Sequence, residues 1–272
     1  MSDRAGRAAA AATAVAAAHG LRSAWTRVLH DGVNVVVHLA PVPVVARVAT
    51  LTPLLRPDPA RPSGREVALA GALAAAGAAV VPPSDLLPPG PHVHDGLTLT
   101  FWTRVEVLPR TPTPAEVATA LAGLHEVLAG LPVTGRPLDT PLDDLAVFSE
   151  RAGAWGVEPA VRARTAEQVE VLRPRLSGRV QVLHGDAHPG NLLATPDGWR
   201  WADLEDTCAG PPEWDLACLQ LTSRLDGRAA LDAAGGPSDA ELAPWLELRR
   251  LHARAWTSVV RAGHTSGSAD SR

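Results

Sequence analysis

The sequence predicts an α+β protein with a small, β-rich N-terminal lobe (residues 1–107) and a larger, mainly helical C-terminal lobe (residues 108–272). Short β-prone runs separated by turn residues fill most of the first part, and amphipathic helical patterns dominate the second. The 272 residues, 46% of them hydrophobic, are enough to build a real core in one large or two modest domains. We therefore expect a folded globular protein of two lobes.

The N-terminal lobe is predicted to begin with an Ala-rich helix and to continue into a β-sheet. Its helices are expected at Arg7–His19 and Arg65–Ala78, and its β-prone runs at Trp25–His30, Val33–Leu39, Val42–Val48 and Gly96–Val107. The pair Asp31-Gly32 favours a tight hairpin between the first two strands. Ser63 is placed to cap the second helix, because Pro and Gly punctuate the chain before it.

The C-terminal lobe changes to helical periodicity. Its helices are expected at Pro114–Leu131, Pro141–Trp155, Glu158–Leu176, Glu213–Leu225 and Asp239–Ala262. Between them lie a short strand, Arg179–Leu183, and a hairpin that pairs Asn191–Ala194 with Arg200–Leu204. The polar tail from residue 263 to 272 is expected to be disordered.

Charge and cysteine usage exclude several classes of protein. With 25 Arg and Lys against 29 Asp and Glu, the net charge of −4 argues against nucleic acid as a partner. No apolar run approaches the ~18 residues of a membrane span, so no membrane partner is expected. The two cysteines, Cys208 and Cys218, form no CxxC pair or disulfide scaffold, and the start lacks a secretory signal, which favours plain thiols and a cytoplasmic protein.

The densest polar cluster, HGDAHPGN at residues 184–191, lies between apolar segments. Asn191 follows Asp186 by five positions, the spacing of the kinase catalytic loop, in which the Asp accepts a hydroxyl proton and the Asn holds Mg²⁺. Asp203 follows twelve positions later, at the end of the predicted hairpin. Phosphoryl transfer needs such oxygen ligands because charge accumulates on the phosphate oxygens.

Three motifs in this order resemble the aminoglycoside phosphotransferase and choline kinase-like family: HGDAHPGNLL (residues 184–193), WADLED (201–206) and GPPEWDLA (210–217). The resemblance extends more weakly to LAGLH (121–125) and the N-terminal strands. It implies a protein-kinase-like fold, with Asp186 as catalytic base and ATP and Mg²⁺ as cofactors. It further implies that Asn191 and Asp203 are the Mg²⁺ ligands, and that His184 and Asp215 support the loop.

The nucleotide side departs from the family pattern. Where the family has a lysine on the third strand this sequence has Arg47, and no lysine occurs anywhere in the chain. Arg keeps the charge and can bind phosphate, but its planar fork is bulkier than an ammonium group. Glu66 is the expected ion-pair partner of Arg47. The remaining expected nucleotide contacts are Gly32 and Asn34 in the hairpin loop, and Trp102 and Thr103 where the adenine would sit.

These residues predict an ATP- and Mg²⁺-dependent phosphotransferase acting on a hydroxyl of a small molecule, such as an aminoglycoside, an amino alcohol or a sugar. Two alternatives stay open. A pseudokinase would bind nucleotide without turnover because of Arg47, and a metal-dependent hydrolase would use the H-x-D-x-H pattern of His184, Asp186 and His188. Alternatively, the ring of His188 simply forms hydrogen bonds with backbone groups and so holds the loop. Glu205 and Asp206 either extend the metal shell, face a cationic substrate or are solvated.

Overall fold

The computed structural model describes residues 3–269, which form two compact units. Within the described residues, the first unit comprises residues 3–71, 81–105 and 256–269. The second comprises Ala72–Val80 and Glu106–Ala255. The end of the last helix therefore belongs to the first unit. The expected division at residue 107 assigned this segment to the C-terminal lobe.

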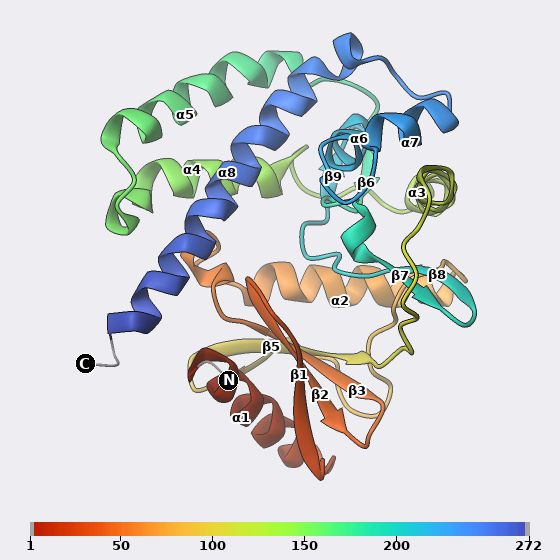
Figure 1. The fold of residues 1–272 in the computed structure, drawn as a ribbon, viewed down its shortest axis with the longest axis vertical. Helices are drawn as coiled ribbons and strands as arrows, with labels where there is room; N and C mark the ends of the chain where they lie inside the picture. Colours follow the sequence, from red (N-terminus) through yellow and green to blue (C-terminus); the bar gives the residue numbers. More distant parts are fainter. Residues whose placement is uncertain (1–2, 270–272) are drawn as a thin grey trace. The chain divides into compact units, whose positions relative to one another are not determined.

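An antiparallel five-stranded sheet forms the centre of the first unit (Figure 1). Its strands are β1 (Trp25–Asp31), β2 (Asn34–Ala40), β3 (Val44–Ala49), β4 (His92–His94) and β5 (Leu97–Thr103), in the order β1-β2-β3-β5-β4. The predicted hairpin joins β1 to β2, and a bulge interrupts their pairing between Val28 and His30. The predicted final β segment, Gly96–Val107, contains β5, whereas the short strand β4 that pairs with β5 lies before the predicted start.

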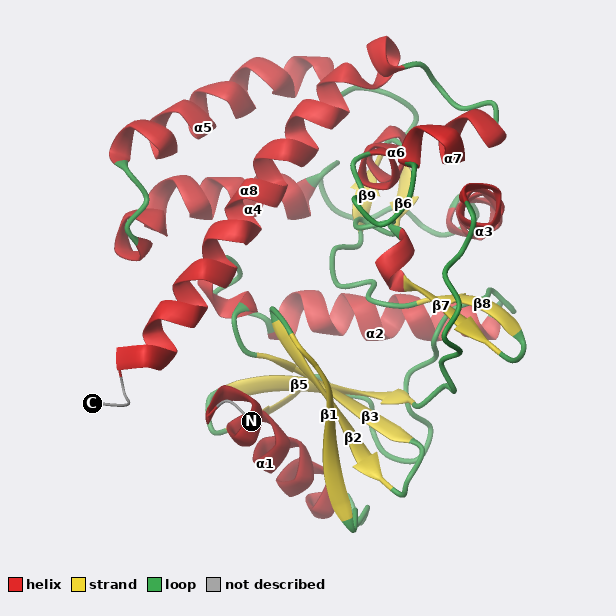
Figure 2. Cartoon of the chain, in the orientation of Figure 1, coloured by secondary structure: helices red, strands yellow, loops and turns green. Residues whose placement is uncertain are grey.

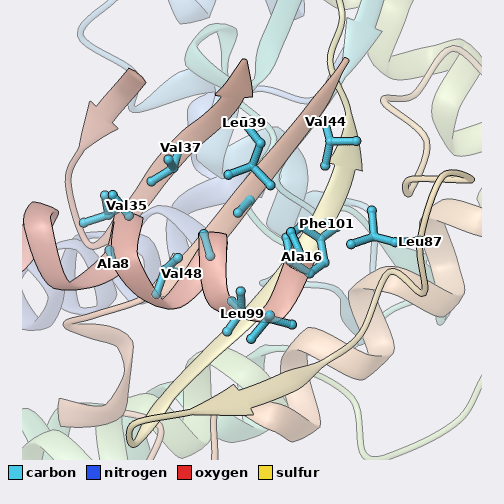
Figure 3. Close-up of a cluster of buried hydrophobic side chains, with 14 of the residues drawn as sticks. Ala8, Ala16, Val35, Val37, Leu39, Val44, Val48, Leu87, Leu99 and Phe101 are labelled. Carbon is cyan, nitrogen blue, oxygen red and sulfur yellow. The ribbon is translucent and has the colours of Figure 1, made fainter. Parts of the chain in front are cut away.

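Helix α1 (Asp3–Ala18) covers one face of this sheet. Figure 3 shows side chains from β2, β3 and β5 meeting Ala8 and Ala16 of the helix. The alternating residues Val44, Ala46 and Val48 of β3 belong to this buried cluster. Because successive side chains of a strand point to opposite faces, Arg47 lies on the other face of the sheet.

Helix α2 (Ala60–Ala75) follows the 3₁₀ turn η1 (Thr52–Leu54) and begins five residues before the predicted start. The expected cap Ser63 lies inside the helix, and its backbone N–H already donates to the carbonyl oxygen of Pro59 at 3.2 Å. Pro62 was interpreted as part of the segment before the helix, but it lies in the first turn. Proline is compatible with a first helical turn, because the N–H group that it lacks needs no partner there. The Ser63 cap was therefore wrong.

The second unit is mainly helical (Figure 2). Its first helices and turns are α3 (Pro114–Leu128), α4 (Asp139–Arg151), η2 (Ala152–Trp155), α5 (Pro159–Leu172) and η3 (Arg173–Arg175). Helix α5 runs back alongside α4 (Figure 2). Helix α3 begins with a capping box, in which Thr113 and Glu116 each bind the other's backbone N–H group.

The remaining elements of this unit carry the motifs. They are β6 (Gln181–Leu183), η4 (Pro189–Asn191), β7 (Leu192–Thr195), β8 (Gly198–Trp201), β9 (Cys208–Gly210), α6 (Glu213–Gln220), α7 (Gly227–Ala233) and α8 (Asp239–Ala269), the last of which continues into the first unit. Strand β6 pairs with β9, and β7 with β8. Cys208 and Cys218 are free thiols, as predicted.

Three features of this unit differ from the expectations. Strand β9 and helix α7 were not predicted, and α7 begins at the cap Asp226, whose side chain accepts the N–H of Ala229 at 3.0 Å. Helix α8 runs to Ala269, where a disordered tail from residue 263 was expected; residues 270–272 lie outside the described part. Between residues 3 and 269, none of the helices combines the length and the apolar character that a membrane span requires.

Candidate active site

The polar motif at residues 184–191 forms a loop that leaves β6 and ends in the turn η4. Gly185 has a φ of +91°, and a Cβ atom at this position would lie 1.9 Å from the backbone oxygen of Asp206. Only glycine tolerates both the backbone conformation and this close approach. The glycine of the motif thus lets the loop pass directly against the segment around Asp206.

Asp215 of α6 holds the start of the loop through hydrogen bonds to its backbone. Its side chain is completely buried and accepts the backbone N–H groups of His184 at 3.0 Å and Gly185 at 2.8 Å. His125 of α3 lies 2.9 Å from the same carboxylate through Nε2. Two backbone donors and one ring nitrogen thus satisfy the buried charge, as a buried carboxylate requires.

His184 is buried and held in its neutral form. Nδ1 accepts the N–H of Asp186 at 3.3 Å, so Nε2 carries the proton and donates to the carbonyl oxygen of Ala202 at 3.2 Å. Burial lowers the pKa of His184, against the opposing charges of Asp215 and Asp186. With both nitrogens bound to backbone, His184 has no lone pair for a metal ion. Nor do residues 3–269 contain any group of three His, Cys, Asp or Glu side chains able to hold one.

The carboxylate of Asp186 has two unequal oxygens. Oδ1 accepts a short hydrogen bond of 2.5 Å from Nη2 of Arg249 on α8. Oδ2 makes longer contacts, at 3.3 Å to Nε2 of His188 and 3.4 Å to Nδ2 of Asn191. Burial raises the pKa of Asp186, but the Arg249 guanidinium and His188 outweigh burial and hold the pKa below its usual range. Asp186 is therefore ionised, as a proton acceptor must be.

His188 has a holding role in this loop. Its Nδ1 accepts the N–H of Gly190 at 2.9 Å and so caps the turn η4. The remaining nitrogen, Nε2, faces Asp186. The ring therefore fixes the loop and one side of the carboxylate together.

Asn191 and Asp203 lie at the same end of the β7–β8 hairpin. Leu192 pairs with Trp201, and the N–H of Ala202 donates to the carbonyl oxygen of Asn191 at 2.8 Å, which continues the ladder by one step. The strand ends at Trp201, whereas it was predicted to reach Leu204. Asp203 consequently lies in the loop that follows the strand, exposed and with a φ of +62°, a conformation that is rare outside glycine.

The donor atoms at this end of the hairpin suit a hard cation. Nδ2 of Asn191 donates to the backbone oxygen of Asp186 at 3.0 Å, so Oδ1 is the atom that Asn191 can offer to a metal ion. The carboxylate of Asp203 supplies a second, anionic oxygen. Magnesium prefers such oxygen ligands and keeps several water or phosphate oxygens besides. The chemistry of these donors therefore fits the metal that the sequence implied.

The acidic pair that follows is less exposed than a solvated pair would be. Glu205 is buried and Asp206 is partly buried. Burial of Glu205 excludes the solvated interpretation for that residue. It also keeps its carboxylate from forming an open acidic surface.

Arg47 and Glu66 meet in the first unit. Nη1 of Arg47 on β3 binds Oε2 of Glu66 on α2, and the Glu66 side chain is 1% exposed. The alternation of β3 brings this about, because it directs Arg47 away from α1. The ion pair proposed from the sequence is thus present, and its phosphate-binding role stays a prediction.

The other expected nucleotide contacts make hydrogen bonds within the first unit. Asn34 Oδ1 accepts the hydroxyl of Thr52 at 2.8 Å, and the N–H of Gly32 donates to the backbone oxygen of Asn34 at 3.1 Å. Trp102 is 9% exposed and its Nε1 donates to Thr100 at 2.9 Å. The hydroxyl of Thr103 donates to the backbone oxygen of Pro83 at 3.2 Å. Their contacts with nucleotide remain predictions.

Sequence reasoning missed three side chains that the loop depends on. They are His125 on α3, and Arg249 and His252 on α8. His125 ends the LAGLH segment, which carried part of the resemblance, so that signal was available. Arg249 and His252 stand among other charged residues of an amphipathic helix, and nothing in that pattern separates them from a solvated face.

Solved structures of small-molecule kinases share this fold. The chain matches a microcompartment-associated aminopropanol kinase with a TM-score of 0.62 and 19% identity over 93% of each chain. It matches a choline kinase from Streptococcus pneumoniae with a TM-score of 0.60 and 16% identity over 90% of this chain and 89% of that one. It matches an aminoglycoside phosphotransferase from Streptomyces rimosus with a TM-score of 0.59 and 17% identity over 93% of this chain and 99% of that one. The protein-kinase-like α+β fold predicted from the sequence is confirmed.

The family comparison covers most of the chain. A model of the phosphotransferase enzyme family matches residues 7–251, which include all three motifs and the contact between Asp186 and Arg249. The match extends over far more than half of the 272 residues. The chain belongs to the phosphotransferase enzyme family.

Proposed function

We propose that this protein is an ATP- and Mg²⁺-dependent phosphotransferase that transfers the γ-phosphoryl group to a hydroxyl of a small molecule. One observation carries the proposal: the ionised Asp186 and the oxygen donors of Asn191 and Asp203 come together at one loop and one hairpin end. Phosphoryl transfer requires a proton acceptor beside oxygen ligands for a metal ion. Membership of the phosphotransferase family supports the same reaction.

Asp186 acts on the acceptor. Among the described residues its Oδ2 has contacts of 3.3 Å and 3.4 Å, longer than the bond of Oδ1, so this oxygen is the one that can take the proton of an acceptor hydroxyl. As the proton moves to Oδ2, the acceptor oxygen bonds to the γ-phosphorus, and the bond from that phosphorus to the β,γ-bridging oxygen breaks. The products are the phosphorylated acceptor and ADP.

Asn191 and Asp203 are the residues that would hold the magnesium ion, through Oδ1 and the carboxylate. When bound, the ion supplies positive charge against the phosphate oxygens. Asn191 is fixed for this task because its amide nitrogen binds the backbone oxygen of Asp186. Asp203 follows the end of the hairpin with its φ of +62°.

Arg47 binds phosphate oxygens of the nucleotide in this proposal. Its guanidinium group carries N–H donors in a fixed fork whose geometry suits phosphate oxygens, and its Nη1 binds Glu66. Glu66 keeps the fork in one orientation. A structure of the related aminoglycoside phosphotransferase from Streptomyces rimosus holds ADP and streptomycin, which supports nucleotide as the donor.

For the acceptor we propose an amine-bearing alcohol or a sugar-like compound. The related structures are named for choline, aminopropanol and aminoglycosides, which all combine a hydroxyl with a nitrogen group. The partly buried Asp206 and Glu213 are the carboxylates of the motif region that can attract such a cation. Both follow the loop closely in sequence.

The test is a screen for acceptor-stimulated ADP release over amino alcohols, aminoglycosides and sugars, beside calorimetry of Mg²⁺-dependent ATP binding. Asp186→Ala should lower turnover by at least ~10²-fold, the usual size of general-base effects, while ATP binding persists. Asp197→Ala is the matched control, because this carboxylate lies 78% exposed in the turn of the same hairpin. ATP binding without release over a broad panel would instead support a pseudokinase.

A further inference from the structure

The contact between Arg249 and Asp186 joins two segments 63 residues apart, one in the polar loop and one on α8. The side chains are 15% and 23% exposed, so water screens the pair only in part. At 2.5 Å, the bond from Nη2 to Oδ1 is shorter than either contact of Oδ2. Charge-assisted bonds of this kind are the strong ones, so Oδ1 is held and the carboxylate cannot rotate freely.

Arg249 is itself held from behind. Its Nη1 lies 3.4 Å from Nδ1 of His252, and Nε2 of His252 lies 2.9 Å from Oδ2 of Asp144 on α4. His252 and Asp144 are 1% and 2% exposed. If Nδ1 of the ring accepts from Arg249, Nε2 carries the proton and donates to Asp144. The guanidinium thus has a fixed support on a second helix.

The support continues into the loop. The indole of Trp214 packs edge-on against His252, with 5.8 Å between ring centroids. The same indole donates from Nε1 to the backbone oxygen of Gly185 at 2.8 Å. Arg249 and the backbone beside Asp186 therefore contact the same buried group of side chains. This group fixes the position of both partners of the contact between Arg249 and Asp186.

We propose that Arg249 is a positioning residue for phosphoryl transfer, which holds Oδ1 of Asp186 so that Oδ2 faces the acceptor hydroxyl. This inference rests on the proposed function. An orienting group acts on the rate of the chemical step, because a misdirected base can still lie beside bound substrates without reacting with them. Arg249 need not touch either substrate for this.

Kinetics of three variants test the role. Arg249→Met removes the fork but keeps an apolar side chain of similar length, and it should lower kcat by about 10²-fold, the cost of a misplaced catalytic group, with KM for ATP and for the acceptor little changed. Arg249→Lys keeps the charge and should recover part of kcat. Arg250→Met is the matched control on the same helix, where the side chain is exposed, and should react like the wild type.

Two readouts separate positioning from loss of structure. In Arg249→Ala, added guanidinium ion at millimolar concentration should restore part of kcat, which a misfolded loop would not allow. Urea unfolding of Asp186→Ala, Arg249→Met and the double variant should give losses of stability that do not add, because each single change breaks the same contact. Arg249→Lys provides the kinetic answer should Arg249→Met fail to fold.

The outcomes distinguish this inference from the proposed function. An active wild type whose Arg249→Met variant keeps its kcat, or loses only affinity, overturns the positioning role and leaves the proposed function intact. Additive losses of stability overturn the contact itself. A wild type without turnover on any acceptor overturns the proposed function and the role of Arg249 with it, and the unfolding cycle then still reports whether the contact exists.

Discussion

The His184 ring donates from Nε2 to the backbone oxygen of Ala202, 3.2 Å away, and so connects the polar loop at residues 184–191 to the strand end that precedes Asp203. Its other nitrogen accepts the N–H of Asp186. Both bonds exist only in one neutral tautomer, since a proton on Nδ1 would point at a second N–H group. The loop therefore depends on an uncharged, buried histidine.

This dependence predicts a loss of stability in mild acid. Burial lowers the pKa of His184 in the folded protein, whereas the unfolded chain has the ordinary value of about 6.5. The unfolded state then binds a proton more readily, so the contribution is complete above about pH 6.5 and is lost progressively as the pH falls from there toward the folded pKa. Urea unfolding at about pH 7.5 and about pH 5.5 measures this loss.

The comparison variant is His184→Gln, which cannot take up a proton in this range. It should be less stable than the wild type at the higher pH, because an amide cannot repeat both bonds of the ring. Its stability should change less between the two pH values. An equal change in the two proteins would assign the acid sensitivity to another group.

Asp215 gives a second prediction, since it is completely buried beneath the loop. Asp215→Ala leaves the N–H groups of His184 and Gly185, and the ring of His125, without their acceptor. We expect a loss of about 3–5 kcal/mol in the free energy of unfolding, the range for breaking a buried charged contact. Urea denaturation measures it.

His125→Ala is the matched variant for this site. It removes one partner of Asp215 and keeps the two backbone bonds, so its loss should be smaller than that of Asp215→Ala. Equal losses would mean that the His125 contact, rather than the backbone bonds, carries the stability of the loop.

Gly185 supports a third prediction, made with a second glycine as control. Gly185→Ala places a methyl group where the backbone of Asp206 already lies, at a φ of +91°, so the loop must move. We expect activity to fall by at least about 10²-fold, as a displaced base requires. Gly123→Ala on α3 has no atom within 4 Å of the new Cβ and should stabilise the helix by up to about 1 kcal/mol.

Activity assays and thermal unfolding on the two alanine variants decide this point. Wild-type turnover in Gly185→Ala would show that the loop accommodates a side chain there. A loss of stability in Gly123→Ala would show that alanine is unfavourable even at a glycine with an ordinary φ and no close neighbour. The effect of Gly185→Ala could then not be assigned to its positive φ and close contact.

Local patterns sufficed to predict the strands β1, β2, β3 and β5 and the pairing of Arg47 with Glu66. The alternation Val44, Ala46, Val48 predicts which face of β3 is buried, and so places Arg47 opposite, where Glu66 of the next helix meets it. The spacing of Asp186 and Asn191 likewise follows from one short loop. Both are set by residues close in the sequence.

Contacts over long separations could not be predicted in this way. His125 and Asp215 are 90 residues apart, and Asp144 and His252 are 108 apart. Each pair depends on how helices pack, and the sequence pattern of an amphipathic helix does not indicate which residue a polar side chain will contact. The short strand β9 escaped for a related reason, because its residues become a strand only by pairing with β6.

Arg47 carries the last prediction, which concerns nucleotide affinity. Arg47→Met should weaken Mg²⁺-dependent ATP binding by about 10- to 100-fold, because a charge-assisted hydrogen bond to phosphate is worth about 1.5–3 kcal/mol. Arg47→Lys should stay closer to the wild type, since the resemblance places a lysine there. Calorimetry gives both dissociation constants, and Arg27→Met, an exposed change on β1 of the same sheet, is the control that should bind normally. If Arg47→Met bound ATP like the wild type, Arg47 would serve only to join β3 to α2 through Glu66.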